Sequence, residues 1–111
     1  MTDVLVRIKR AVLAGHYAFS EKAFMEMDAD RITKQDIVES ILNAVAIYKT
    51  LRSRSPFRTH ARERLYVIQS TNLDGLAIYT KGKLMTEAGH DTFKGGHTVA
   101  VGIAMSCQQD E

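Results

Sequence analysis

The sequence contains only one cysteine, Cys107, so an intramolecular disulfide and a cysteine-rich zinc site are both excluded. No apolar run reaches the length needed to cross a bilayer. The N-terminal segment also lacks the apolar core of a signal peptide, because Asp3, Arg7 and Lys9 interrupt it. We therefore expect a cytoplasmic protein that does not bind a membrane.

Common enzyme signatures are missing as well. The chain has no G-x-x-x-x-G-K-[ST] phosphate loop, no G-x-G-x-x-G turn and no G-x-S-x-G nucleophile elbow. Its four histidines, which are His16, His60, His90 and His97, do not show metal-ligand spacing. The sequence therefore argues against a zinc enzyme and against a nucleotide-triphosphate enzyme, and we expect neither a metal nor a nucleotide cofactor.

Length and composition fit one globular domain over residues 1–111, since 45% of the residues are hydrophobic and 25% are charged. Helical periodicity dominates the first half. Apolar residues recur at helical spacing over residues 4–12, and Ser20 is a typical cap for a second helix. Thr33 and Asp36 form a variant capping box, which opens a third and strongly periodic helix.

The second half of the chain changes to the two-residue period of strands. Strand-like segments occupy four ranges, which are 46–51, 64–71, 76–85 and 97–105. The turn sequence NLDG at 72–75 predicts a hairpin between the second and third of them. Helices first and strands later predict an α+β fold, in which N-terminal helices pack on one face of a mostly antiparallel sheet of four or more strands.

Positive charge is concentrated in one segment. Residues 49–64 contain six basic side chains and one acid, a local charge of +5 in a chain whose net charge is +2. Such a segment attracts phosphates, although a solvated loop can have the same composition. If the segment binds an anionic partner, we expect that partner to be RNA or an acidic protein, and side chains of the predicted strands would then contribute to the same surface. The RNA-binding candidates are Arg52, Arg54, Arg58, Arg62, Tyr66, Lys81 and Lys83.

Side chains of these types can cleave RNA without a metal. RNA carries its own nucleophile, the 2′-hydroxyl, so the protein must supply a proton acceptor, cations for the charge on the phosphate, and an acid for the leaving 5′-oxygen. Lysine and tyrosine can fill these roles if the site lowers a lysine pKa or crowds cations together. Arg64 could bind a phosphate in bidentate fashion, and His60 or His97 could carry protons near neutral pH.

Three segments, VRIKRAVLAGHYAFSEKAFMEM, ITKQDIVESILN and IYKTLRS, together resemble the bacterial MqsR-type toxins and their small relatives. The later segment RERLYVIQSTNLDGLAIYTKGKL is similar to the central hairpin of the same group. These proteins are compact ribonucleases of the wider RelE/ParE-like superfamily, and the resemblance covers roughly residues 4–85. It implies an mRNA-cleaving toxin whose partners are single-stranded mRNA and a cognate antitoxin.

The resemblance also implies which residues take part in cleavage. The lysine of the Tyr-Lys step in such toxins contributes to cleavage, and it corresponds to Lys49 here. A glutamine and a tyrosine on the sheet usually assist, and Gln69 and Tyr79 are the nearest equivalents. With Arg64 added for its phosphate-binding geometry, the predicted catalytic set is Lys49, Arg64, Tyr79 and Gln69.

Two departures from the family pattern keep other functions open. Related small domains often have a histidine where this chain has Lys22, and residues 87–111 match nothing in the pattern. The first alternative is a catalytically inactive binding module of the same fold, which interacts with an antitoxin-like protein or with RNA. The second is a plain basic RNA binder, whose affinity would depend steeply on salt without any cleavage.

Overall fold

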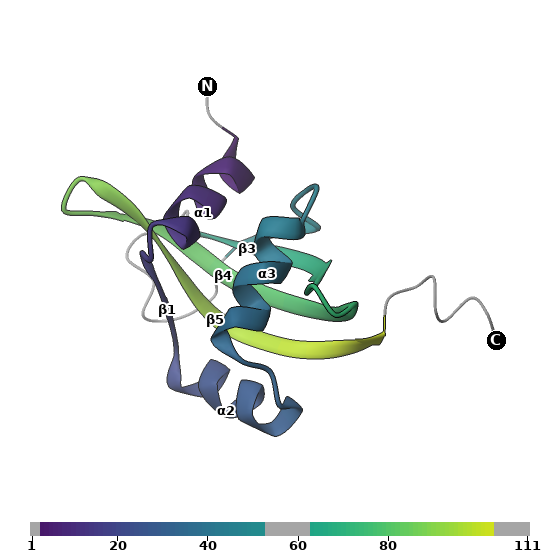
Figure 1. Ribbon diagram of the computed structural model, residues 1–111. Helices are drawn as coiled ribbons and strands as arrows, with labels where there is room; N and C mark the ends of the chain where they lie inside the picture. The colour runs from purple at the N-terminus through teal and green to yellow at the C-terminus, as the bar shows by residue number, and fades with distance from the viewer. Residues whose placement is uncertain (1–2, 53–62, 104–111) are drawn as a thin grey trace.

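The computed structural model describes residues 3–52 and 63–103 of the chain (Figure 1). Within these ranges it contains three helices and five strands, which confirms the predicted α+β class. The helices are α1 (Val4–Leu13), α2 (Glu21–Asp30) and α3 (Lys34–Asn43), and the strands are β1 (Tyr17–Phe19), β2 (Lys49–Arg52), β3 (Arg64–Thr71), β4 (Leu76–Glu87) and β5 (His90–Ile103). No helix in the described ranges is long and apolar enough to cross a membrane.

The local sequence determines which side of α1 is buried and where α2 begins. In α1, Leu5, Ile8 and Val12 are buried, and their spacing places them on one side of the helix. At the start of α2, the Ser20 hydroxyl oxygen accepts a hydrogen bond from the N–H of Ala23 at 3.1 Å. This contact confirms the predicted N-cap.

The predicted capping box of α3 is also confirmed. The Thr33 hydroxyl accepts the N–H of Asp36 at 3.1 Å, and the Asp36 carboxylate accepts the N–H of Thr33 at 2.9 Å. The hydrogen bond from the Thr33 backbone is the main cause of a lowered pKa for Asp36, and the amide of Asn72 adds to the effect. Asp36 thereby ties the start of α3 to the turn between β3 and β4.

The strands form one sheet in the order β1-β5-β4-β3-β2, with β1 parallel to β5 and all other neighbours antiparallel. The strand predicted at 64–71 is confirmed as β3, whereas β2 begins at Lys49 and β5 already at His90. The glycine-containing stretch before residue 97 is therefore strand as well. β1 has no predicted counterpart, because three residues are too few to show an alternating pattern.

The helices divide the sheet into two different faces. Figure 1 shows α1 and α3 lying across one face, which we call the helix face, and α2 lying along the outer edge of β5. The opposite side of the sheet is called the second face. Ile68 of β3, Ile78 of β4 and Phe93 of β5 point from the helix face into the hydrophobic core. The core cluster consists of Leu5, Ile8, Val12, Met27, Ile32, Ile37, Ile41, Ala44, Ile68, Ile78 and Phe93.

The hairpin of β4 and β5 extends beyond the rest of the sheet (Figure 1). Its turn residues, Ala88 and Gly89, both have positive φ angles of 50° and 84°, as a two-residue type I′ turn requires. Arg7 of α1 donates two hydrogen bonds of 2.9 Å to the carboxylate of Asp91 near this turn. The side-chain hydrogen bond from Arg7 is the main reason why the pKa of Asp91 falls to about 2.

Candidate active site on the second face of the sheet

Strand register places polar side chains in rows across the second face. Lys49 is the partner of Val67, Val67 is the partner of Lys81, and Lys81 is the partner of His97. Directly paired residues of antiparallel strands project to the same side of a sheet. Because the neighbouring Ile68 points into the core, this row projects away from α1 and α3.

A second row lies next to the first. Gln69 is the partner of Tyr79, and Tyr79 is the partner of Val99. The Tyr79 ring meets the ring of His97 edge to face, with 5.6 Å between the ring centroids. Lys81, Tyr79 and His97 are all half-buried, whereas Gln69 is exposed. The second face therefore holds an imidazole, a phenol and an ammonium group within one small area.

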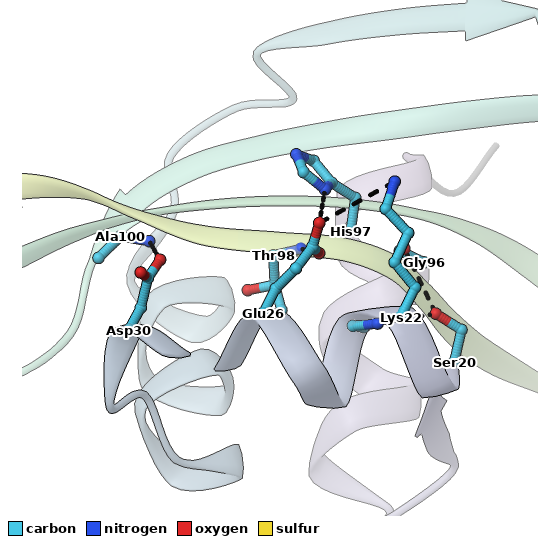
Figure 2. A network of polar contacts seen from close by, with 9 residues as sticks. Ser20, Lys22, Glu26, Asp30, Gly96, His97, Thr98 and Ala100 are labelled. Atoms are coloured by element: carbon cyan, nitrogen blue, oxygen red, sulfur yellow. Dashed lines mark hydrogen bonds and ion pairs between the residues drawn. The ribbon is translucent and has the colours of Figure 1, made fainter. Parts of the chain in front are cut away.

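Glu26 of α2 completes this group from the edge of the sheet. Its Oε2 atom lies 2.6 Å from Nδ1 of His97 and 3.9 Å from Nζ of Lys22 (Figure 2). A carboxylate only accepts hydrogen bonds, so the contact places a proton on Nδ1 and leaves Nε2 of a neutral ring as a proton acceptor. Glu26 is 20% exposed and His97 27% exposed, so the pair is partly shielded but open to a substrate.

The position of Glu26 follows from how α2 covers the edge of β5. Its Oε1 atom accepts the N–H of Thr98 at 2.9 Å, and one helical turn later the carboxylate of Asp30 accepts the N–H of Ala100 at 2.9 Å (Figure 2). Residues four apart on a helix and two apart on a strand have similar separations, so two carboxylates can bind two outward N–H groups. The same contacts block edge pairing with another strand.

An extra residue in β5 turns His97 toward the second face. His97 pairs with Lys81, but the next residue of β4, Gly82, pairs with Gly95, so Gly96 has no partner on β4. Such a bulge shifts the in-and-out alternation by one residue. Without it, His97 would follow Phe93 and Gly95 onto the helix face.

The structure brings together only part of the predicted catalytic set. Lys49, Gln69 and Tyr79 share the second face, whereas Arg64 projects to the helix face, two residues before Tyr66 on the same strand. Lys49 and His97 are three strands apart, which is roughly 14 Å at the usual strand spacing. Lys49 therefore shares the face with the Glu26–His97 pair but is separated from it by Val67 and Lys81.

The predicted RNA-binding residues are divided in a similar way. Arg52 pairs with Arg64, and both are exposed on the helix face. Tyr66 is packed against the core cluster on the same face. Lys81 and Lys83 lie on the second face, where Lys83 forms an ion pair with Glu63 at 3.4 Å. The remaining candidates, Arg54, Arg58 and Arg62, lie outside the described residues, as does His60.

Sequence reasoning did not assign a role to Glu26 and did not place His97 in the predicted catalytic set. Glu26 is an ordinary helix residue in the sequence, with no spacing signal that connects it to a histidine 71 positions later. Lys22, where the toxins that the sequence resembles often have a histidine, lies next to this pair. The imidazole of the site thus comes from β5, in the segment that matched no family pattern.

Comparisons with known proteins do not identify the site, so its interpretation depends on the chemistry of its own residues. No protein-family model matches the chain, and neither a curated protein nor a solved structure shows significant similarity to it. Within residues 3–52 and 63–103, no group of three or more His, Cys, Asp and Glu side chains is arranged to hold a metal ion.

Proposed function

We propose that the protein is an endoribonuclease that uses the RNA 2′-hydroxyl as nucleophile, and that the Glu26–His97 pair is its acid–base centre. The observation that carries the proposal is the 2.6 Å contact between Glu26 and Nδ1 of His97, on a sheet face that also holds Lys81 and Tyr79. A carboxylate that orients an imidazole is a recurrent way to prepare its other nitrogen for proton transfer.

The reaction assigns a role to each of these side chains. Nε2 of His97 takes the proton of the 2′-hydroxyl, the 2′-oxygen attacks the phosphorus, and the bond to the 5′-oxygen breaks. Lys81, directly opposite His97, stabilises the negative charge that grows on the phosphate. The Tyr79 hydroxyl donates the proton that the leaving 5′-oxygen requires. The products are a 2′,3′-cyclic phosphate and a 5′-hydroxyl, and the proton held by the His97 imidazolium then returns through solvent to the Tyr79 phenolate, which restores both groups.

The outer part of the second face would guide the RNA strand. Lys49 and Gln69 are exposed at the β2 and β3 side of the face, where they could contact neighbouring phosphates and sugars of a single strand. Within this proposal the chain is an mRNA-cleaving toxin of the MqsR or RelE/ParE-like type. A cognate antitoxin would then have to cover the second face to inhibit it, as part of a cytoplasmic toxin–antitoxin pair.

The proposal is tested by incubating the purified protein with a defined single-stranded mRNA and mapping the cleavage sites. We expect discrete cuts with cyclic phosphate ends, and a loss of about 10²- to 10⁴-fold in rate for His97→Gln, the usual contribution of general acid–base catalysis. His90→Gln is the matched control, since His90 lies in the hairpin and stacks on His16. It should cleave like the wild type.

Other outcomes favour the alternatives. Full activity of His97→Gln would remove the acid–base centre from the mechanism. If the wild type binds RNA with a steep salt dependence but never cuts it, the protein is a basic RNA binder. If it neither cuts nor binds RNA, an inactive binding module that holds an antitoxin-like protein becomes the better explanation.

A further inference from the structure

A pocket lies on the second face directly beside the Glu26–His97 pair. Its volume is about 320 Å³, at the lower end of the range of about 300–1,000 Å³ that is typical of small-molecule sites. One of its lining residues, Gly96, immediately precedes His97 in the chain, so their Cα atoms are about 3.8 Å apart. Among the described residues, the lining consists of Ala18, Phe19, Ser20, Lys83, Lys94, Gly95 and Gly96.

The floor of the pocket is formed by residues without large side chains. A Cβ atom on Gly96 would have no heavy atom within 4 Å, so this position opens into free space. A Cβ atom on Gly95 would instead approach the Phe19 ring to 2.7 Å, which shows that β1 and β5 are packed closely below the pocket. The bulge at Gly96 therefore does two things, since it turns His97 to the second face and leaves an exposed residue without a side chain next to it.

Two lysines stand at the rim of the pocket, and each of them is paired with a carboxylate. Lys94 pairs with Glu87 at 3.2 Å, but both side chains are well exposed, and such a surface pair is worth little. Lys94 can therefore exchange Glu87 for a phosphate. Lys83 stands opposite Lys94 in the strand register and is held in place by Glu63. The result is a pocket with two neighbouring lysines at one side of its rim and the exposed Gly96 in its lining.

We propose that this pocket is a nucleoside subsite, which holds the base and sugar next to the phosphate that is cleaved. A planar base can lie against the exposed Gly96, while Lys94 binds the neighbouring phosphate. The neighbouring His97 is then within reach of the 2′-hydroxyl or the 5′-oxygen of the same nucleotide. The inference rests on the proposed function for the identity of its ligand, but its binding test does not require cleavage.

The test uses trinucleotides of DNA, one for each base, because DNA lacks the 2′-hydroxyl and cannot be cut. We expect at least one of them to shift the backbone amide NMR signals of Gly95, Gly96 and Lys94 in a saturable way. Gly96→Leu fills the pocket without a backbone clash and should weaken this binding on the order of 10-fold or more. Gly96→Ala adds a single methyl group and should have a smaller effect of the same sign.

Cleavage kinetics and a phosphate control complete the experiment. In the RNA assay, Gly96→Leu should raise KM by a similar factor, and its melting temperature should stay close to that of the wild type. Unchanged trinucleotide affinity in a folded Gly96→Leu protein would overturn the subsite. Inorganic phosphate alone should not reproduce the trinucleotide shifts; if it does, the pocket binds phosphate and not a nucleoside.

The subsite and the proposed function can fail separately. Cleavage of RNA by Gly96→Leu with the KM of the wild type would support the ribonuclease activity and contradict the subsite. Saturable trinucleotide binding at Gly95 and Gly96, without cleavage of any RNA by the wild type, would support the subsite and contradict the proposed ribonuclease activity.

Discussion

The two faces of the sheet are built from the same strands but carry different side chains. On the helix face, Ile68 and Ile78 are completely buried among the side chains of α1 and α3. On the second face, their strand neighbours Gln69 and Tyr79 remain partly or fully open to solvent. The two-residue period of a strand makes this division possible. Stability and activity should therefore respond to different, sequence-adjacent residues.

The largest effect is expected from a core residue. Ile68→Ala removes a fully buried side chain and should lower the free energy of unfolding by about 2–5 kcal/mol, through lost burial and a cavity. Urea denaturation measures the change. Gln69→Ala, one position later, is exposed and should change stability by less than about 0.5 kcal/mol. If both variants lose the same stability, the division between the two faces is wrong.

The next largest effect distinguishes two roles of α2, which are to cover the edge of β5 and to orient His97. Glu26 and Asp30 both accept an N–H group of β5, but only Glu26 contacts His97. In Glu26→Gln, an amide N–H would face Nδ1 and hold the ring in the wrong tautomer. We expect this to slow RNA cleavage on the order of 10- to 100-fold, a part of the usual acid–base contribution.

Asp30→Asn is the matched control for that experiment. It changes the charge of α2 as Glu26→Gln does and keeps an oxygen that can accept the N–H of Ala100, but it does not touch the imidazole. Its cleavage rate should equal that of the wild type, and the pH profile of cleavage should change only in Glu26→Gln. Equal losses in both variants would mean that α2 acts by covering the strand edge and not by orienting His97.

The helix face was largely predictable from the sequence, because local patterns determine it. The caps at Ser20 and Thr33 and the strand at 64–71 all act over a few residues, and all are confirmed. The second face depends on long-range features. The bulge at Gly96 changes which residues of β5 point to the second face, and the sequence pattern does not predict such a bulge. Thr98 is consequently buried, and a second bulge, at which Val101 has no partner on β4, leaves the more apolar Val101 exposed.

Side-chain direction explains the remaining differences in the candidate site. Arg64 and Tyr66 have the residue types of an RNA-binding surface, but their positions along β3 place them on the helix face with Ile68. Only the register of the sheet shows this, since a shift by one residue reverses every side chain of a strand. The contact between Glu26 and His97 could not be predicted either, because it joins a helix and a strand through tertiary packing alone.

The smallest effect concerns an ion pair on the helix side, between Arg7 and Asp91. Asp91 has its pKa lowered to about 2, chiefly by the hydrogen bond from Arg7, against about 3.9 for an unfolded aspartate. A lowered pKa means that the pair stabilises the fold above about pH 4 and that this contribution is lost as the pH falls through about 2. Because Arg7 is 39% exposed, we expect at most about 1 kcal/mol.

Asp91→Asn measures this contribution directly. The difference in unfolding free energy between the wild type and Asp91→Asn should be constant from pH 7 to pH 5 and should shrink steadily toward pH 2. RNA cleavage at pH 7 should stay unchanged, because Arg7 and Asp91 join α1 to β5 and do not contact the Glu26–His97 pair. A difference independent of pH would show that Asp91 stabilises the hairpin by its shape and not by its charge. Loss of cleavage in a stable Asp91→Asn protein would instead show that the two faces are coupled, and that the proposed acid–base centre depends on how α1 holds the start of β5.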